Sequence, residues 1–153
     1  MQEIKTLSVP GLVKVSSMQA LRLCLKDLIA HYEKESDRYG EKVGQLMRIL
    51  ESEARGKDIT KLREVEWKRS GMVLVNTDDP GRGTLELVIE AMEDYKAKAR
   101  RTAEVLAQIS ALEDLRIPDG ASILVYLRHG VPLRVVVDRV KKPQIDQMIQ
   151  AIY

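Results

Sequence analysis

The stretch Leu85–Ile109, LELVIEAMEDYKAKARRTAEVLAQI, carries the most regular apolar pattern in this chain. Apolar or small residues recur in it at alternating steps of three and four, namely Leu85, Val88, Met92, Tyr95, Ala99, Thr102, Leu106 and Ile109. That spacing is the a/d seam of a heptad helix. At 1.5 Å per residue the helix is about 40 Å long, which is more than a small globular core needs. We therefore expect it to lie against another long helix, from the same chain or from a second copy.

A partner helix is expected between Ser16 and Arg55. The same spacing recurs there in Met18, Leu21, Leu25, Leu28, Tyr32, Glu35 and Tyr39. Ser16 and Gln19 have the form of a capping box at its start. Gly40 and Gly44 each cost an interior helix on the order of 1 kcal/mol relative to Ala, so they indicate a kink or a close helix approach.

The other apolar segments predict a small β-sheet. Residues 2–15 read as a hairpin around Pro10-Gly11, and residues 122–138 as a hairpin around His129-Gly130. Residues 72–76 begin with four consecutive apolar residues, which is typical of a central strand covered on both faces. Pro143 then starts a short helix over residues 143–152. We predict an α+β fold in one domain: an antiparallel, coiled-coil-like pair of helices over 16–55 and 84–115, with a small mixed or antiparallel sheet built from the two terminal hairpins and residues 72–76.

Both faces of the C-terminal hairpin are rich in apolar residues. If the two-residue turn alone sets the register, Tyr126 faces Leu133 on one side and Ile123 faces Val136 on the other. The long helices cover only one face, and a large apolar patch is seldom left in water. The other face is then covered by the C-terminal helix, a second subunit or a partner, and the expected association surface is Ile123, Val125, Leu127 and Val136.

Composition excludes several classes of protein. The 153 residues carry a net charge of +2, too small to imply a polyanionic partner by itself. A single cysteine excludes an intrachain disulfide and a Cys-rich zinc site. No apolar stretch has the length of a membrane span and no signal-peptide core is recognisable, so the expected location is the cytoplasm. Heavy use of Lys, Arg and Glu also fits a thermophilic source.

Three local patterns carry weak chemical signals. The loop from Asp79 to Gly83 stands between a strand and a helix, as in phosphate-binding proteins, but lacks the P-loop lysine and the third dinucleotide-binding glycine. Cys24, Asp27, His31 and Glu35 share one helix stripe, yet one helix cannot close a tetrahedral metal site. No nucleophile–base motif is present. We therefore predict no cofactor, no metal and, on balance, no catalysis.

Basic clusters support a further interpretation. The candidate nucleic-acid contacts are Lys96, Lys98, Arg100, Arg101, Arg139, Lys141 and Lys142. Binding requires these side chains to converge on one face and release counterions. Acidic neighbours such as Glu93 and Glu104, and the scarcity of aromatic residues, argue for an ordinary solvated helix instead.

Two function classes follow. The first is a non-enzymatic assembly or adaptor module that self-associates through its amphipathic helices, as a two-fold dimer, and binds a protein partner. The second is a small DNA- or RNA-binding protein that uses the basic clusters.

Overall fold

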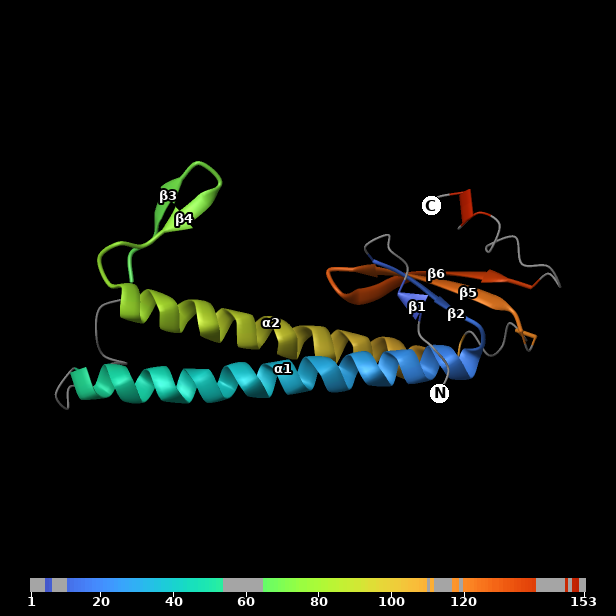
Figure 1. Cartoon of the computed structure of the whole chain (residues 1–153), viewed down its shortest axis with the longest axis horizontal. Coiled ribbons are helices and arrows are strands. Elements are labelled where there is room, and N and C mark those ends of the chain that lie inside the picture. Colours follow the sequence, from blue (N-terminus) through green and yellow to red (C-terminus); the bar gives the residue numbers. More distant parts are fainter. Residues whose placement is uncertain are drawn as a thin grey trace. The chain divides into compact units, whose positions relative to one another are not determined.

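The computed structural model describes residues 5–6, 11–53, 65–109, 111, 117–118, 120–139, 148 and 150–151. Within them the chain forms two helices, α1 (Met18–Glu53) and α2 (Pro80–Gln108), and six short strands (Figure 1). The α+β class is thereby confirmed. The chain divides into two compact units, residues 1–32 with 97–153 (unit 1) and residues 33–96 (unit 2), and each is described by itself. The helix expected over residues 143–152 lies outside the described residues except for 148, 150 and 151, which are helical.

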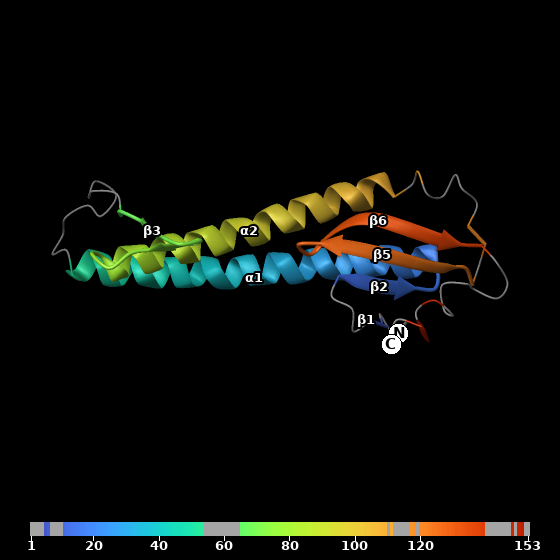
Figure 2. The same ribbon diagram turned by 90° about the horizontal axis from the view of Figure 1, so that it is seen from above.

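Unit 1 contains a four-stranded antiparallel sheet in the order β1-β2-β5-β6. The strands are β1 (Lys5–Thr6), β2 (Leu12–Val15), β5 (Ser122–Arg128) and β6 (Val131–Asp138), and Figure 2 shows them side by side. The sheet is therefore built from the two terminal hairpins, as predicted. Residues 72–76 do not join it, so that part of the prediction was wrong.

The core of unit 1 lies between one face of this sheet and the two helices. Strand residues that alternate along β2 and β5, such as Val13, Ile123 and Val125, pack against Leu21 and Leu25 of α1. Cys24 and Ile109 belong to the same cluster, and Val105 and Leu106 lie against it. The apolar side chains that alternate along the strands and those that recur every three or four residues along the helices thus form a single apolar layer.

The β5–β6 hairpin turns at His129-Gly130, where both residues have positive φ (52° and 79°). Two consecutive positive φ angles define a type I′ turn, which matches the twist of the flanking strands. Past this turn the expected register fails, because Leu127 pairs with Pro132 but Tyr126 pairs with Arg134. Leu133 is the extra residue of a β-bulge, and it moves every later pair by one position.

Helix α1 begins one residue later than the capping box predicted. The amide of Ala20 donates to the hydroxyl of Ser17 at 3.0 Å, so Ser17 rather than Ser16 caps the helix. The end expected at Arg55 lies outside the described residues, and α1 is described to Glu53.

In unit 2 the two helices contact each other in antiparallel order. A Cβ on Gly81 of α2 would lie 3.0 Å from Leu50 of α1, whereas one on Gly40 would lie 3.6 Å from the sulfur of Met92. Tyr39 stacks on Tyr95 with ring centroids 5.7 Å apart. At Gly40 the spacing to α2 is thus that of ordinary van der Waals contact. At the predicted seam position of Glu35, the buried residue is instead its neighbour Ser36.

Helix α2 starts at Pro80, four residues before the predicted Thr84. The Asp79 carboxylate accepts the amide of Arg82 at 3.1 Å, as an N-cap does, and proline suits the first helical position. The Asn76 side chain in turn accepts the amide of Asp79 at 3.1 Å. The turn-forming residues Asn76 and Asp79 therefore cap helix α2 and do not form a separate loop before it. The end predicted at Leu115 lies outside the described residues.

Strands β3 (Lys68–Ser70) and β4 (Val73–Val75) form a separate two-stranded hairpin in unit 2. All six residues are exposed, so the prediction of a strand buried on both faces was wrong. A short run of apolar residues is typical of a buried strand. The run alone does not show whether another element of the fold covers that strand. Among the described residues no helix is long and apolar enough to cross a membrane.

Candidate interaction surfaces

One face of the four-stranded sheet points away from the helices of unit 1 (Figure 1). The register places on it the side chains that alternate with the core residues, because successive strand residues point to opposite faces. We call this the outer sheet face and define it by Leu12, Lys14, Leu124, Tyr126, Arg128, Arg134 and Val136, together with the bulged Leu133.

Three large apolar side chains of the outer sheet face are accessible. Tyr126 is 39% exposed, Leu133 57% and Val136 55%. Leu12 and Leu124 are half-buried beside them. Leu12 and Tyr126 are cross-strand partners, as are Leu124 and Val136, so the apolar side chains are neighbours rather than scattered. A contiguous apolar patch of this kind is characteristic of a binding surface.

The exposed charges on this face are cationic. Arg134 lies directly across from Tyr126, and Arg128 lies two residues farther along β5. Both side chains are exposed, and neither forms a salt bridge with any residue in the described part of the chain. Asp138, the acidic member of β6, is buried at the far end of the strand. Tyrosine and arginine beside aliphatic groups form the composition found at the centres of protein interfaces.

The predicted association surface divides between the two faces. Ile123 and Val125 are fully buried in the core, and Leu127 packs against that core. Val136 pairs with Leu124 on the outer sheet face, not with Ile123 as expected. The bulge at Leu133 causes this difference, because a one-residue shift of a strand exchanges its two faces. Tyr126 and Leu133 were assigned to the helix-covered side and are in fact exposed.

The predicted nucleic-acid contacts belong to different parts of the chain. Lys98, Arg100 and Arg101 lie on α2 in unit 1, and the Lys98 side chain is near the hairpin turn, 3.8 Å from a Cβ placed on Gly130. Arg139 follows β6 at its opposite end, about 25–30 Å from that turn at 3.3 Å per residue. Lys96 belongs to unit 2, and Lys141 and Lys142 lie outside the described residues.

Ionisable groups with catalytic potential are dispersed. Cys24 is buried, and this burial, followed by the charge of Asp27, raises the pKa of its thiol above 9.0. A thiol held protonated is a poor nucleophile. His129 sits in the hairpin turn, and His31 is exposed on α1. Among the described residues no three His, Cys, Asp or Glu side chains are placed to hold a metal ion.

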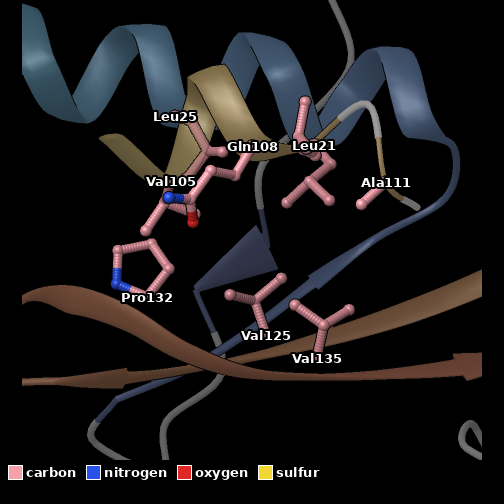
Figure 3. Close-up of a pocket in the computed structure, with 9 residues that line it drawn as sticks. Leu21, Leu25, Val105, Gln108, Ala111, Val125, Pro132 and Val135 are labelled. Atoms are coloured by element: carbon pink, nitrogen blue, oxygen red, sulfur yellow. The ribbon is translucent and has the colours of Figure 1, made fainter. Parts of the chain in front are cut away.

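An apolar cavity of about 250 Å³ lies beneath the sheet in unit 1. Figure 3 shows its walls: Leu21 and Leu25 from α1, Val105 and Gln108 from α2, Ala111, and Val125, Pro132 and Val135 from the two hairpin strands. The amide of Gln108 is the polar group among these side chains. Such a space is large enough for an additional methylene or a small apolar molecule.

Comparison with known proteins identifies no relative: no family model, curated protein or solved structure matches this sequence.

Proposed function

We propose that this chain is a non-enzymatic assembly module that binds a partner protein through the outer sheet face. The observation that carries the proposal is the exposure of Tyr126, Leu133 and Val136 beside two arginines. Fully burying a side chain of this size gains about 1.5–3 kcal/mol. A partner that covers these three side chains therefore has a substantial source of binding energy.

A protein fits this surface better than a nucleic acid. Single-stranded DNA or RNA is bound by aromatic side chains on which bases stack, and Tyr126 is the one aromatic residue of the outer sheet face. Leu133 and Val136 offer no stacking surface, but they suit the apolar centre of a protein interface. The separation of Lys98 from Arg139 also weakens the case for a continuous phosphate-binding track.

The arginines favour a partner that carries carboxylates. Arg128 and Arg134 lie at the edge of the apolar patch, where an Asp or Glu of the partner would pair with them. A second copy docked by the same face would oppose one cationic surface to another, with no exposed carboxylate among the residues that define the face, since a two-fold interface pairs a surface with itself. Like charges brought together in this way cost several kcal/mol. The proposed partner is therefore a different protein, with an acidic and apolar contact segment.

Selection from a displayed library of random peptides tests this proposal with a defined probe. Peptides selected on the intact chain are expected to combine aromatic or aliphatic residues with Asp or Glu. Val136→Lys is expected to abolish their binding, and Arg134→Glu to weaken it at least tenfold. Arg100→Glu, a matched charge reversal on the exposed side of α2, is expected to leave it unchanged.

Two results would refute the proposal. One is a set of selected peptides whose binding survives both outer-face substitutions. The other is tight binding of a random single-stranded oligonucleotide that falls steeply with added salt and is lost in Arg134→Glu, which would support the DNA- or RNA-binding function instead.

A further inference from the structure

Unit 2 exposes a second apolar element, the β3–β4 hairpin. Met72 at its turn is 98% exposed, and Val73, Leu74 and Val75 are 61%, 53% and 40% exposed. Figure 1 shows the hairpin standing off the start of α2. An isolated two-stranded hairpin is at best marginally stable in water, and four consecutive exposed apolar residues are usually covered. The hairpin therefore presents an apolar surface of the kind that a docking partner covers.

The base of the hairpin is nevertheless firmly attached. The indole of Trp67 donates to the Glu86 carboxylate at 2.7 Å, and the Asn76 amide donates to the Glu66 carbonyl at 3.0 Å. The first bond ties the start of the hairpin to α2, and the second ties the two ends of the hairpin to each other. Its apolar strands project from a fixed base.

A shallow groove on α2 in the same unit has complementary properties. Its described lining residues are Leu87, Glu90, Ala91, Glu93 and Asp94. Four of these residues fall on one helix stripe, because 87, 90, 91 and 94 are spaced by i, i+3, i+4 and i+7. Leu87 is 54% exposed, so the stripe has an accessible apolar centre with carboxylates around it.

Charge and polarity match between the two elements. From Lys68 to Val75 the hairpin carries two cations, Lys68 and Arg69, and no acidic residue. The described residues that line the groove include three carboxylates and no cation. The apolar side chains of the hairpin would cover Leu87 and Ala91, and the cations would meet Glu90 and Glu93. In the structure of the single chain these surfaces are exposed, so they do not satisfy each other within one copy.

We propose that the β3–β4 hairpin of one copy lies in the α2 groove of a second copy, and the reverse, as a two-fold dimer. Each copy supplies one hairpin and one groove, so a two-fold arrangement of two copies uses every hairpin and every groove. The sequence predicted a dimer held together by the helix seams, whereas this proposal assigns the dimer contact to the hairpin and the groove. The seam residues of α1 and α2 are buried or half-buried within their own units, whereas the hairpin and groove are accessible. This inference concerns unit 2 and does not depend on the partner of the outer sheet face.

Reciprocal charge reversal tests the exchange in the full chain. The hairpin variant carries Lys68→Glu and Arg69→Glu, and the groove variant carries Glu90→Lys and Glu93→Lys. Each variant alone opposes like charges at both contacts of its own dimer. Sedimentation analysis is expected to show a dimer for the wild type and an increase of roughly a hundredfold in the dimer dissociation constant for each variant.

Mixing the two variants is the decisive measurement. In the mixed pair both hairpin–groove contacts again join opposite charges, so the mixture is expected to recover the dimer mass. The matched control Arg100→Glu with Arg101→Glu reverses two cations elsewhere on α2 and is expected to remain dimeric. Leu74→Asp, which alters the apolar strand, is expected to be monomeric with unchanged helix content by circular dichroism.

A monomeric wild type would overturn the inference, as would variants that remain dimeric. Failure of the mixture to recover would also overturn it, since that outcome means the charges act within one chain rather than between two. Loss of peptide binding at the outer sheet face would change none of these results, so the two proposals fail separately.

Discussion

Replacing Gly130 with alanine should destabilise unit 1 more than an alanine at any glycine with free space around it. Gly130 has φ 79°, a left-handed conformation that costs an L-residue about 1–2 kcal/mol. A Cβ at this position would also collide with the hydroxyl of Tyr32. That hydroxyl, on a buried side chain, donates a hydrogen bond to the Gly130 carbonyl.

The magnitude follows from these two terms. Backbone strain contributes about 1 kcal/mol, and loss of the Tyr32 hydrogen bond contributes about another 1 kcal/mol. Displacing the buried ring adds to both, so Gly130→Ala is expected to lower the free energy of unfolding by about 2–3 kcal/mol. Gly120 is the matched control, because it has φ 82° in the same unit and a Cβ placed there would meet nothing within 4 Å. Gly120→Ala is expected to cost about 1 kcal/mol.

Urea unfolding followed by circular dichroism measures both variants, and a double-mutant cycle with Tyr32→Phe separates the terms. Tyr32→Phe alone should cost about 1 kcal/mol, and Gly130→Ala should cost less in that background than in the wild type. Equal costs for the two glycine variants, with no coupling to Tyr32, would refute the assigned contact between the hairpin turn and α1.

Three further outcomes are expected. Leu25→Ala should cost about 2–5 kcal/mol in urea unfolding because Leu25 is 1% exposed, whereas Leu23→Ala, at a position 46% exposed, should cost clearly less; equal costs would contradict the assigned helix face. Val105→Leu places one more methylene in the 250 Å³ cavity and should raise stability by about 0.5–1 kcal/mol, while a loss of stability would mean that the cavity has no room for it. The raised pKa of Cys24 means that the folded chain holds the thiol proton more tightly than the unfolded chain, so this contribution to stability is complete below pH 9.0 and is lost as the pH rises through the folded-state pKa. The melting temperature should therefore fall more steeply above pH 9.0 in the wild type than in Cys24→Ala, and parallel pH profiles would exclude the effect.

The features that depend on local periodicity and turn chemistry could be predicted from the amino-acid sequence. Leu21 and Leu25 on α1, and Ala99 and Thr102 on α2, were placed on the buried side from their spacing, since a helix returns to the same face every three or four residues. The His129-Gly130 turn followed from its position between two apolar runs, because few residues accept positive φ. The α+β class and the terminal origin of the sheet needed no further information.

The contacts that each of those elements makes are visible only in the tertiary structure. The bulge at Leu133 places Val136 on the face of Leu124 rather than on that of Ile123, because one extra residue exchanges the faces of the strand that follows it, and no turn rule reveals it. The apolar run Met72–Val75 has the composition of a buried strand, but its exposure depends on whether other elements reach it. The arginines of the outer sheet face, Arg128 and Arg134, lie six residues apart in the chain and share a face only through the pairing of β5 with β6. Whether a residue is buried, and whether charged residues lie on one face, depends on residues that are distant in the sequence. A local pattern describes only one of the two segments that come together.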